Sequence, residues 1–196
     1  MSPRADEPRT TPEESAESVN PWRTVSTKAV YDNPWINVRE DAVVRPDGRP
    51  GIYGVVRFKN VAVGVLAVEA GDVYLVGQYR YTLERYSWEI VEGGCAAGEE
   101  PLEAARRELE EETGLRARHW LRMGESHLSN SVTDEYAVWY LAKGLEQGEC
   151  NLEGTERLQV RRVPFEEALR MALAGEITDA ISMLALMQLK LRPNLL

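Results

Sequence analysis

The sequence has 196 residues, 43% of them hydrophobic and 28% charged, which predicts a soluble globular protein with one domain of ordinary size. Its 23 basic and 32 acidic residues give a net charge of −9, which argues against a surface that coats nucleic acid, because such surfaces are basic. The apolar runs are too short for a membrane-spanning helix, which needs roughly 18 residues, and no signal segment opens the sequence.

The first segment along the chain, residues 1–20, is rich in Ser, Thr, Pro and Glu and almost free of large apolar residues. Such a segment cannot bury enough surface to offset its ordering entropy, so we predict a flexible acidic tail. Apolar residues with strand periodicity follow, interrupted by the turn signal Pro46-Asp47-Gly48. The predicted strands are residues 23–32, 35–44, 51–58, 61–68, 73–79 and 86–91, and Gly93-Gly94 follows the last of them.

The periodicity then changes to that of a helix. Glu100-Pro101 opens the helix, because proline is tolerated at the first helical position and an acidic residue suits the helix dipole there. Leu102, Ala105 and Leu109 form an apolar stripe, and Gly114 is a C-cap. The later predicted elements are strands at 120–126, 136–142 and 158–163 and helices at 165–174 and 180–191, the last capped by Thr178-Asp179.

This order of elements predicts an α+β fold, with helices on both faces of a mixed β-sheet in an αβα sandwich. An N-terminal antiparallel β extension precedes the sandwich. The predicted division of the chain is a tail at 1–20, a β extension at 21–60 and a main domain at 61–196.

One short segment carries most of the negative charge: residues 92–112 hold eight acidic and two basic residues. Glu108, Glu111 and Glu112 lie within a 100° arc of the predicted helix, at 100° per residue. Like charges at this spacing destabilise a helix by about 0.2–0.5 kcal/mol per pair, so a cation is expected beside them. Carboxylate oxygens suit Mg²⁺ or Mn²⁺. From the acidic residues alone, a solvated helix face is the alternative.

The residues around these glutamates follow a fixed pattern. Gly93 is followed after five residues by Glu99, and after seven more by the run Arg107-Glu108-Leu109-Glu110-Glu111-Glu112-Thr113-Gly114-Leu115. Residues 93–115 therefore resemble the Nudix box, G-x5-E-x7-R-E-U-x-E-E-x-G-U with U aliphatic, at every specified position. On this pattern the chain is identified as a member of the Nudix hydrolase superfamily, whose fold is an αβα sandwich with a strand–loop–helix–loop metal site.

The resemblance implies roles for the acidic residues of the box. In the family, the glutamates that match Glu108, Glu111 and Glu112 bind the divalent metal, Mg²⁺ with Mn²⁺ as a possible substitute. The backbone carbonyl that matches Glu92 often completes a metal shell. Two or three such ions hold the phosphoryl oxygens and lower the pKa of a bound water, which attacks the diphosphate.

The resemblance also implies supporting roles. The residue that matches Arg107 orients the glutamates by ion pairing, and the residue that matches Glu99 supports the loop. Gly93 and Gly114 match backbone positions. Val91 stands where relatives have a proline.

Segments outside the box resemble the branch of ADP-ribose and nucleoside-diphosphate-sugar pyrophosphatases. This resemblance implies cleavage of such a sugar nucleotide to a nucleoside monophosphate and a sugar phosphate. A proline that often marks the branch's substrate loop, here 128–135, is absent between residues 102 and 163, so sugars other than ribose stay open. The segments are Gly77-Gln78-Tyr79-Arg80, Ser87-Trp88-Glu89-Ile90 and Gly175-Glu176-Ile177-Thr178-Asp179-Ala180.

Several residues outside the box are candidates for the site by the same resemblance. Arg80 resembles the branch's substrate-binding arginine, and Arg57 is a second phosphate candidate. Tyr53 has a ring on which a base can stack, with packing in a core or dimer as the alternative. A loop glutamate serves as base or extra metal ligand in the branch, and we favour Glu156 over Glu153.

The expected partners follow from the same comparison. The substrate is a small nucleotide, and the extension at 21–60 is expected to form a homodimer. Cys95 and Cys150 are too few for a disulfide framework and belong to no metal motif, so we expect free thiols in the cytoplasm. Two alternatives stay open: another Nudix substrate (a dinucleoside polyphosphate, a nucleoside triphosphate or an RNA 5′ end), and a non-catalytic Nudix-fold sensor. Sensors usually lose box glutamates, whereas this chain keeps them.

Overall fold

Two β-sheets follow one another along the chain in the computed structural model, which describes residues 19–148 and 158–196. The first sheet is antiparallel and has the order β1-β2-β3. Its strands are β1 (Arg23–Asp32), β2 (Ile36–Val44) and β3 (Pro50–Phe58). This confirms the predicted N-terminal antiparallel β extension, while residues 1–18 of the predicted tail lie outside the described residues.

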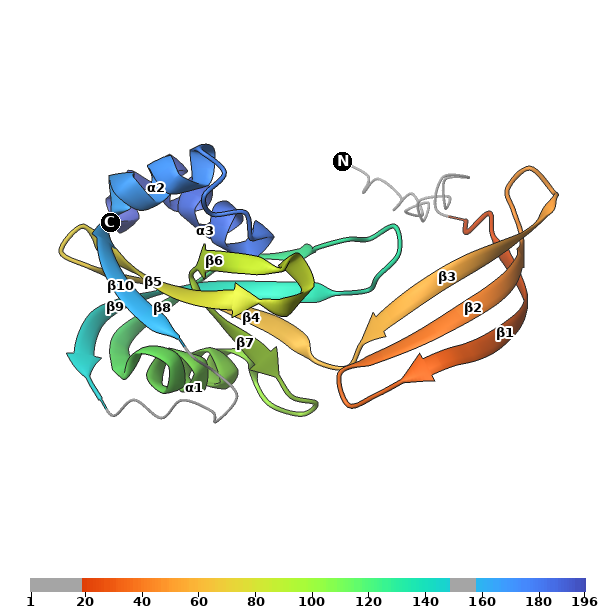
Figure 1. Cartoon of the computed structure of the whole chain (residues 1–196), viewed down its shortest axis with the longest axis horizontal. Coiled ribbons are helices and arrows are strands. Elements are labelled where there is room, and N and C mark those ends of the chain that lie inside the picture. Colours follow the sequence, from red (N-terminus) through yellow and green to blue (C-terminus); the bar gives the residue numbers. More distant parts are fainter. Residues whose placement is uncertain (1–18, 149–157) are drawn as a thin grey trace, which may run out of the picture.

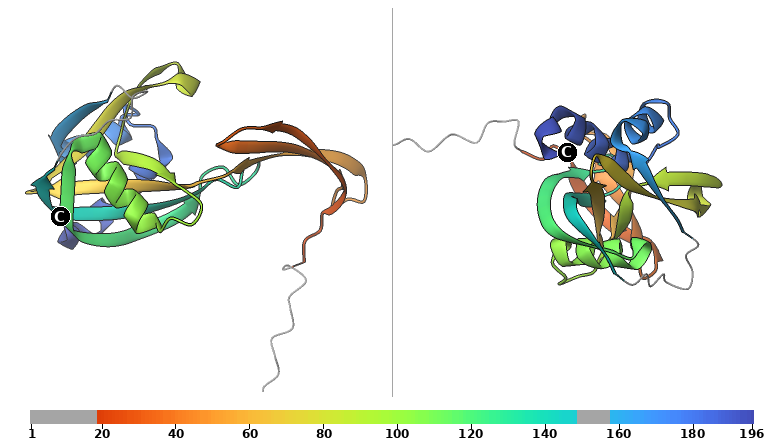
Figure 2. Two further views of the ribbon diagram at one scale, coloured as in Figure 1. Left: turned by 90° about the horizontal axis from the view of Figure 1, so that it is seen from below. Right: turned by 90° about the vertical axis from the view of Figure 1, so that its left-hand side faces the viewer.

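The N-terminal sheet extends away from the rest of the molecule (Figures 1 and 2). Every residue of β1 is exposed, so this sheet has little core of its own. Several of its exposed side chains are large and apolar. The large exposed apolar side chains on or beside this sheet are Trp22, Val25, Val30, Tyr31, Trp35, Ile52 and Phe58.

The second sheet has seven strands and is mixed. Its central path is β10-β5-β4-β9-β8, with β6 paired to β5 and β7 paired to β4. Strands β4 and β9 run parallel, and the other pairs are antiparallel. The strands are β4 (Val61–Glu69), β5 (Asp72–Arg80), β6 (Arg85–Glu89), β7 (Val91–Cys95), β8 (Leu115–His127), β9 (Tyr136–Gln147) and β10 (Gln159–Pro164).

Helices cover both faces of this sheet (Figure 1). Side chains on a strand alternate between faces, and β4 shows this: Val63 and Val65 join the core under α1 (Pro101–Thr113), whereas Leu66 and Val68 join the core under the other helices. Those helices are α2 (Phe165–Leu173) and α3 (Ala180–Leu191). The αβα sandwich and the predicted helices are confirmed. Within the described part of the chain, no helix is long and apolar enough to cross a membrane.

The single predicted strand at 86–91 is wrong. The chain forms β6, leaves its partner β5 at Ile90, and continues as β7 beside β4. Gly93 and Gly94, expected after the strand, lie within β7. A switch of partner is a tertiary event, and the uninterrupted apolar and aromatic pattern carries no sign of it.

Two other predicted strands are too short. Strand β8 begins at Leu115, directly after helix α1, and β9 continues to Gln147. Much of β8 is polar and exposed because it is an edge strand, paired within the described sheet only to β9. Its backbone hydrogen bonds keep it in the sheet where its side-chain pattern does not predict a strand.

Candidate functional site

Helix α1 places the box glutamates beside the core. Pro101 begins the helix, and Gly114 ends it in the left-handed conformation with φ of 68°, donating its N–H to the Glu110 carbonyl at 2.8 Å. Ala105 and Leu109 are buried against the sheet. Glu112 is on the edge of this buried stripe and only 3% exposed, so the helix presents a carboxylate where water is largely excluded.

Arg107 is the centre of the ion-pair network in the box. Its Nη1 donates to Glu108 at 2.7 Å and to Glu111 at 3.0 Å. Its Nε donates to Glu99 at 3.2 Å, and its Nη2 donates to the Gly94 carbonyl at 2.9 Å. One guanidinium therefore links the helix, the preceding loop and strand β7, as its planar fork of donors allows.

These contacts shift the ionisation of both partners. Hydrogen bonds from Arg107, with a further one from the Ala96 N–H, hold the pKa of Glu99 below its usual range. Hydrogen bonds to Glu99, Glu108 and Glu111 raise the pKa of Arg107. The network therefore places a permanent cation among the acidic side chains of the box.

Gly93 lies directly against the helix. A Cβ at this position would overlap the carboxyl group of Glu108, so a larger residue would displace that carboxyl group from its place against strand β7. The backbone of the box's first residue and the first of its three glutamates are in contact as a result.

The chemistry of this donor set fits a hard divalent cation, because it consists of carboxylates from one helix face and backbone carbonyls beside them. Within residues 19–148 and 158–196, no group of three or more His, Cys, Asp or Glu side chains is already gathered as a metal cage. Arg107 holds Glu108 and Glu111 instead. A metal ion at this helix would have to draw carboxylates away from the guanidinium.

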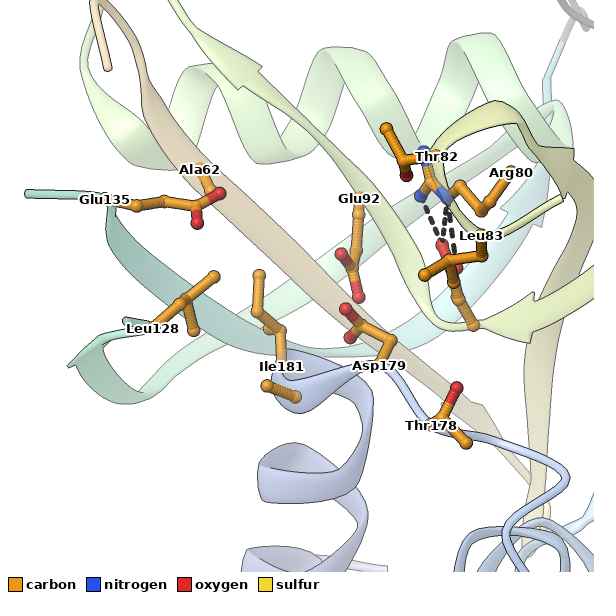
Figure 3. A pocket seen from close by; sticks show the side chains of 12 residues that line it. Ala62, Arg80, Thr82, Leu83, Glu92, Leu128, Glu135, Thr178, Asp179 and Ile181 are labelled. Carbon is orange, nitrogen blue, oxygen red and sulfur yellow. Dashed lines mark hydrogen bonds and ion pairs between the residues drawn. The ribbon is translucent and has the colours of Figure 1, made fainter. Parts of the chain in front are cut away.

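A cavity of about 460 Å³ lies on the side of β7 that faces helix α3 (Figure 3). Four carboxylates and one arginine give it a polar character: Glu89, Glu92, Glu135, Asp179 and Arg80. The glutamates of α1 are not among the described residues that line it. The other lining residues are Ala62, Thr82, Leu83, Leu128, Thr178, Ala180 and Ile181.

Arg80, predicted to bind substrate, does reach this cavity. Its Nε donates to both carboxylate oxygens of Glu89 at 3.0 Å, and its Nη2 also bonds Glu89. Glu89 is 3% exposed, so the arginine neutralises a buried carboxylate. The hydrogen bonds to Glu89 raise the pKa of Arg80, which stays charged in the cavity wall.

Two other carboxyl groups in the cavity have raised pKa values. Burial, and then the charge of Asp179, raise the pKa of Glu92 well above its usual range. Burial and the charge of Asp179 raise the pKa of Glu135 in the same way. Figure 3 shows the carboxyl groups of Glu92 and Asp179 facing one another. This part of the cavity therefore favours protonated carboxyl groups and hydrogen-bond donors from a ligand.

Tyr53 and Arg57 lie on β3 beside the loop at 128–135 that was expected to contact substrate. The Tyr53 hydroxyl donates to the Ser131 carbonyl at 2.7 Å, and Arg57 pairs with Asp134 at 3.8 Å. Asp134 also accepts from the Phe58 N–H at 2.9 Å. Both residues therefore contact the loop in this structure.

A second hollow, of about 180 Å³, adjoins the cavity. Ala62 and Glu135 line both spaces. Gly93 and Gly94 line the second one. The start of the box and the carboxylate cavity are therefore neighbours. The remaining lining residues are Trp35, Phe58, Asn60 and Val61.

The predicted loop bases, Glu153 and Glu156, lie outside the described residues, as does Cys150. Glu89 and Asp179 were not predicted as site residues, and Glu135 was predicted only as part of the substrate loop at 128–135. They come from separate elements, and Asp179 reads in the sequence as a helix cap, which it also is: it accepts from the Ser182 N–H at 2.7 Å. Only the fold brings these groups together.

Two family models match the chain. A model described as the nucleoside diphosphate sugar hydrolase N-terminal domain matches residues 22–56, and the NUDIX domain model matches residues 58–184. The boundary between the two matches falls close to the end of strand β3.

Similar proteins include two that are named ADP-ribose pyrophosphatase. The protein from Bacillus subtilis (strain 168) is 32% identical over 176 residues, which cover 88% of this chain and 95% of the relative. The protein from Mycobacterium tuberculosis is 32% identical over 165 residues, which cover 82% of this chain and 79% of the relative. A methanol dehydrogenase activator from Bacillus methanolicus is 28% identical, with coverage of 88% and 95%.

A solved structure described as an ADP compounds hydrolase has the same fold. The two superpose with a TM-score of 0.80 over 88% of this chain and 94% of the other, at 20% sequence identity. The N-terminal sheet is needed to reach this coverage, so the shared fold extends beyond the seven-stranded sheet and its helices.

Proposed function

The chain belongs to the Nudix hydrolases and is a pyrophosphohydrolase, and on this premise we propose that it splits a nucleoside diphosphate sugar, ADP-ribose or a close analogue, with Mg²⁺ as its cofactor. The products are a nucleoside monophosphate and a sugar phosphate. The observation that carries the proposal is the complete set of box residues around Arg107, next to a carboxylate-lined cavity of about 460 Å³.

Glu108, Glu111 and Glu112 hold the metal in this proposal, with the backbone carbonyl of Glu92 as a further ligand. Bound Mg²⁺ would neutralise charge on the diphosphate and lower the pKa of a water molecule. Arg107 pairs with Glu108 and Glu111 and keeps their carboxyl groups aligned, which prevents their mutual repulsion from spreading them apart. Glu99 in turn orients Arg107.

The flanking residues bind the rest of the substrate. Arg80, already charged in the cavity wall, contacts a phosphate group. Glu135 and Asp179 accept hydrogen bonds from sugar hydroxyl groups, which suits a neutral polyol better than a second chain of phosphates. This preference supports a sugar nucleotide over a nucleoside triphosphate or a dinucleoside polyphosphate.

Arg57 and Tyr53 act on substrate through the loop that they hold. Either Glu156 or Glu153 supplies the base that accepts the proton of the attacking water, with Glu156 favoured. The relatives named as ADP-ribose pyrophosphatases support ADP-ribose as the first substrate to test.

The active form in this proposal is a homodimer joined through the N-terminal sheet. The sheet exposes large apolar side chains that include Trp35 at 67% and Ile52 at 73%. Burial of this surface against a second copy would give the sheet the core that it lacks.

A substrate panel tests the proposal. The purified protein with Mg²⁺ is incubated with ADP-ribose, ADP-glucose and GDP-mannose, and in parallel with ATP, a diadenosine polyphosphate and capped RNA. We expect at least one sugar nucleotide to be cleaved fastest, as measured by kcat/KM. Faster cleavage of a compound from the second group would reject the substrate class, and binding without any turnover would favour a sensor.

A further inference from the structure

The chain changes partner strands immediately before the box. Ile90 belongs to neither β6 nor β7, and it is fully buried. Its N–H therefore needs a partner outside the ladder, because an unsatisfied buried N–H is costly. The partner is the hydroxyl of Ser182 in the first turn of α3, which accepts at 2.9 Å.

The same hydroxyl holds a second residue of this segment. Ser182 donates to the Glu92 side chain at 3.0 Å, so its one hydroxyl group bonds the residues immediately before and after Val91. Ser182 is itself 0% exposed. Its backbone N–H is capped by Asp179 at 2.7 Å, which fixes the turn of helix that carries the hydroxyl.

Close packing keeps α3 at the distance that these bonds require. Gly64 on β4 lies opposite the start of the helix, and a Cβ there would come within 2.7 Å of Ile181 Cγ2 and 3.2 Å of Ile90 Cδ1. A larger residue at position 64 would move the helix or Ile90. The glycine therefore sets a short, defined separation between α3 and the strands.

The opposite face of β7 contacts the box helix. Glu92 points toward Ser182, and Gly93, the next residue, lies against the carboxyl group of Glu108. Adjacent residues of a strand face opposite sides. The strand is thus held between a buried hydroxyl on one side and a box glutamate on the other.

We infer that Ser182 is a positioning residue for the box: its hydroxyl fixes Ile90 and Glu92, and thereby sets where the Glu92 carbonyl and Gly93 stand against Glu108. The inference rests on the proposed function, in which that carbonyl is a metal ligand. Val91 stands where relatives have a proline, whose ring would stiffen this segment. Two hydrogen bonds to one serine stiffen it here.

The test compares Ser182→Ala with Ala185→Gly, a change one turn along the same helix at another fully buried residue. Mn²⁺ affinity is measured by electron paramagnetic resonance, and exchange of the Ile90 amide by NMR. We expect Mn²⁺ binding to weaken 10- to 100-fold in Ser182→Ala, the range for residues that orient metal ligands, and Ile90 exchange to rise at least tenfold. Ala185→Gly should lower the melting temperature without either effect. Equal Mn²⁺ affinity in the two variants would overturn the inference.

A second pair of variants tests the same link without altering α3. Glu92→Gln keeps an oxygen that can accept from Ser182, whereas Glu92→Met does not, and both remove the ionisable carboxyl group. We expect Mn²⁺ to bind several-fold more weakly to the methionine variant, and equal affinities would overturn the inference. A wild-type protein that binds no Mn²⁺ would instead reject the proposed metal site, and the inference with it.

Discussion

At the scale of single residues, the box shows how one cation can organise many acids. Arg107 bonds three glutamates and a backbone carbonyl. Each of these acidic residues alone resembles an ordinary surface residue, and their shared partner distinguishes them. Glu110, on the same helix, bonds Arg116 instead, at 2.8 Å, and so belongs to the outer surface.

Glu112→Gln tests the metal role of the buried glutamate. The change preserves shape but removes one charge from the proposed ligand set, so we expect kcat/KM to fall at least 100-fold with little change in melting temperature. Glu110→Gln is the matched control and should keep activity within about twofold. Activity of Glu112→Gln near the wild-type level would mean that this carboxylate is not a ligand.

Glu135 gives the cavity a pH-dependent contribution to stability. A carboxyl whose pKa is raised by folding holds its proton more tightly in the folded state, so its contribution falls as pH rises from the usual value of 4.5 through the raised pKa. Glu135→Gln removes the carboxyl group and with it this loss of stability at higher pH. The melting temperature of the variant minus that of the wild type should therefore be larger at pH 8 than at pH 4. Glu84→Gln, at an exposed carboxyl, is the control, and a pH-independent difference for Glu135→Gln would contradict the assignment.

At the scale of elements, strand β3 and the loop at 128–135 form one unit. Besides the side-chain contacts, the Val56 N–H donates to the Val132 carbonyl at 2.9 Å, and the Asp134 N–H donates to the Val56 carbonyl at 3.2 Å. Leu128 and Glu135, at the two ends of this loop, line the cavity. The N-terminal sheet therefore influences the cavity through this loop.

Asp134→Ala should loosen this unit. Loss of the bond to Phe58 costs about 1 kcal/mol, so we expect KM for the substrate to rise about fivefold while kcat changes little. Asp72→Ala is the control. It breaks an ion pair to Arg162, at 2.8 Å, at the other end of the seven-stranded sheet, and it should leave KM unchanged. Steady-state kinetics measure KM for both variants. Equal KM values would contradict a role of this loop in substrate binding.

The elements also mark what can be predicted from the sequence. The box helix is predictable from its apolar stripe, its N-terminal proline and its C-terminal glycine. The two C-terminal helices are predictable from the proline or capping aspartate that precedes each of them. The break in the strand at Ile90 is not predictable, because it arises where the chain changes its pairing partner from β5 to β4. The cavity could not be predicted for a related reason: Glu89, Glu135 and Asp179 lie in three distant segments of the sequence, and no local spacing connects them.

At the scale of the whole molecule, the exposure of the N-terminal sheet is the feature least well explained by a monomer. Its strands pair well, yet β1 is exposed along its full length. A second copy that covers this sheet would account for the apolar residues on it. The proposed dimer would then also affect catalysis, because the sheet holds the loop beside the cavity.

Light scattering after size-exclusion chromatography measures the oligomeric state. We expect about twice the chain mass of 22.1 kDa for the wild type and a shift toward the monomer for Ile52→Asp, which places a charge in the proposed interface. Leu173→Asp changes a similarly exposed residue on α2 and should remain a dimer. A monomeric wild type, or two variants that behave alike, would contradict an interface at this sheet.

The net charge of −9 also has a structural meaning at this scale. The acidic residues of the box surround an arginine and, in our proposal, a divalent metal. The acids of the cavity include groups with raised pKa. The acidity is therefore compatible with the proposed anionic substrate, which would be bound through cations that the acidic residues hold.

The most direct test of this account is ³¹P NMR of ADP-ribose with the metal-stripped protein in ¹⁸O-labelled water. The account predicts AMP and a sugar phosphate, with one label incorporated per cleavage, only after Mg²⁺ or Mn²⁺ is added. An unchanged ADP-ribose spectrum with Mg²⁺, under conditions in which the same preparation rapidly hydrolyses a nucleoside triphosphate, would contradict it.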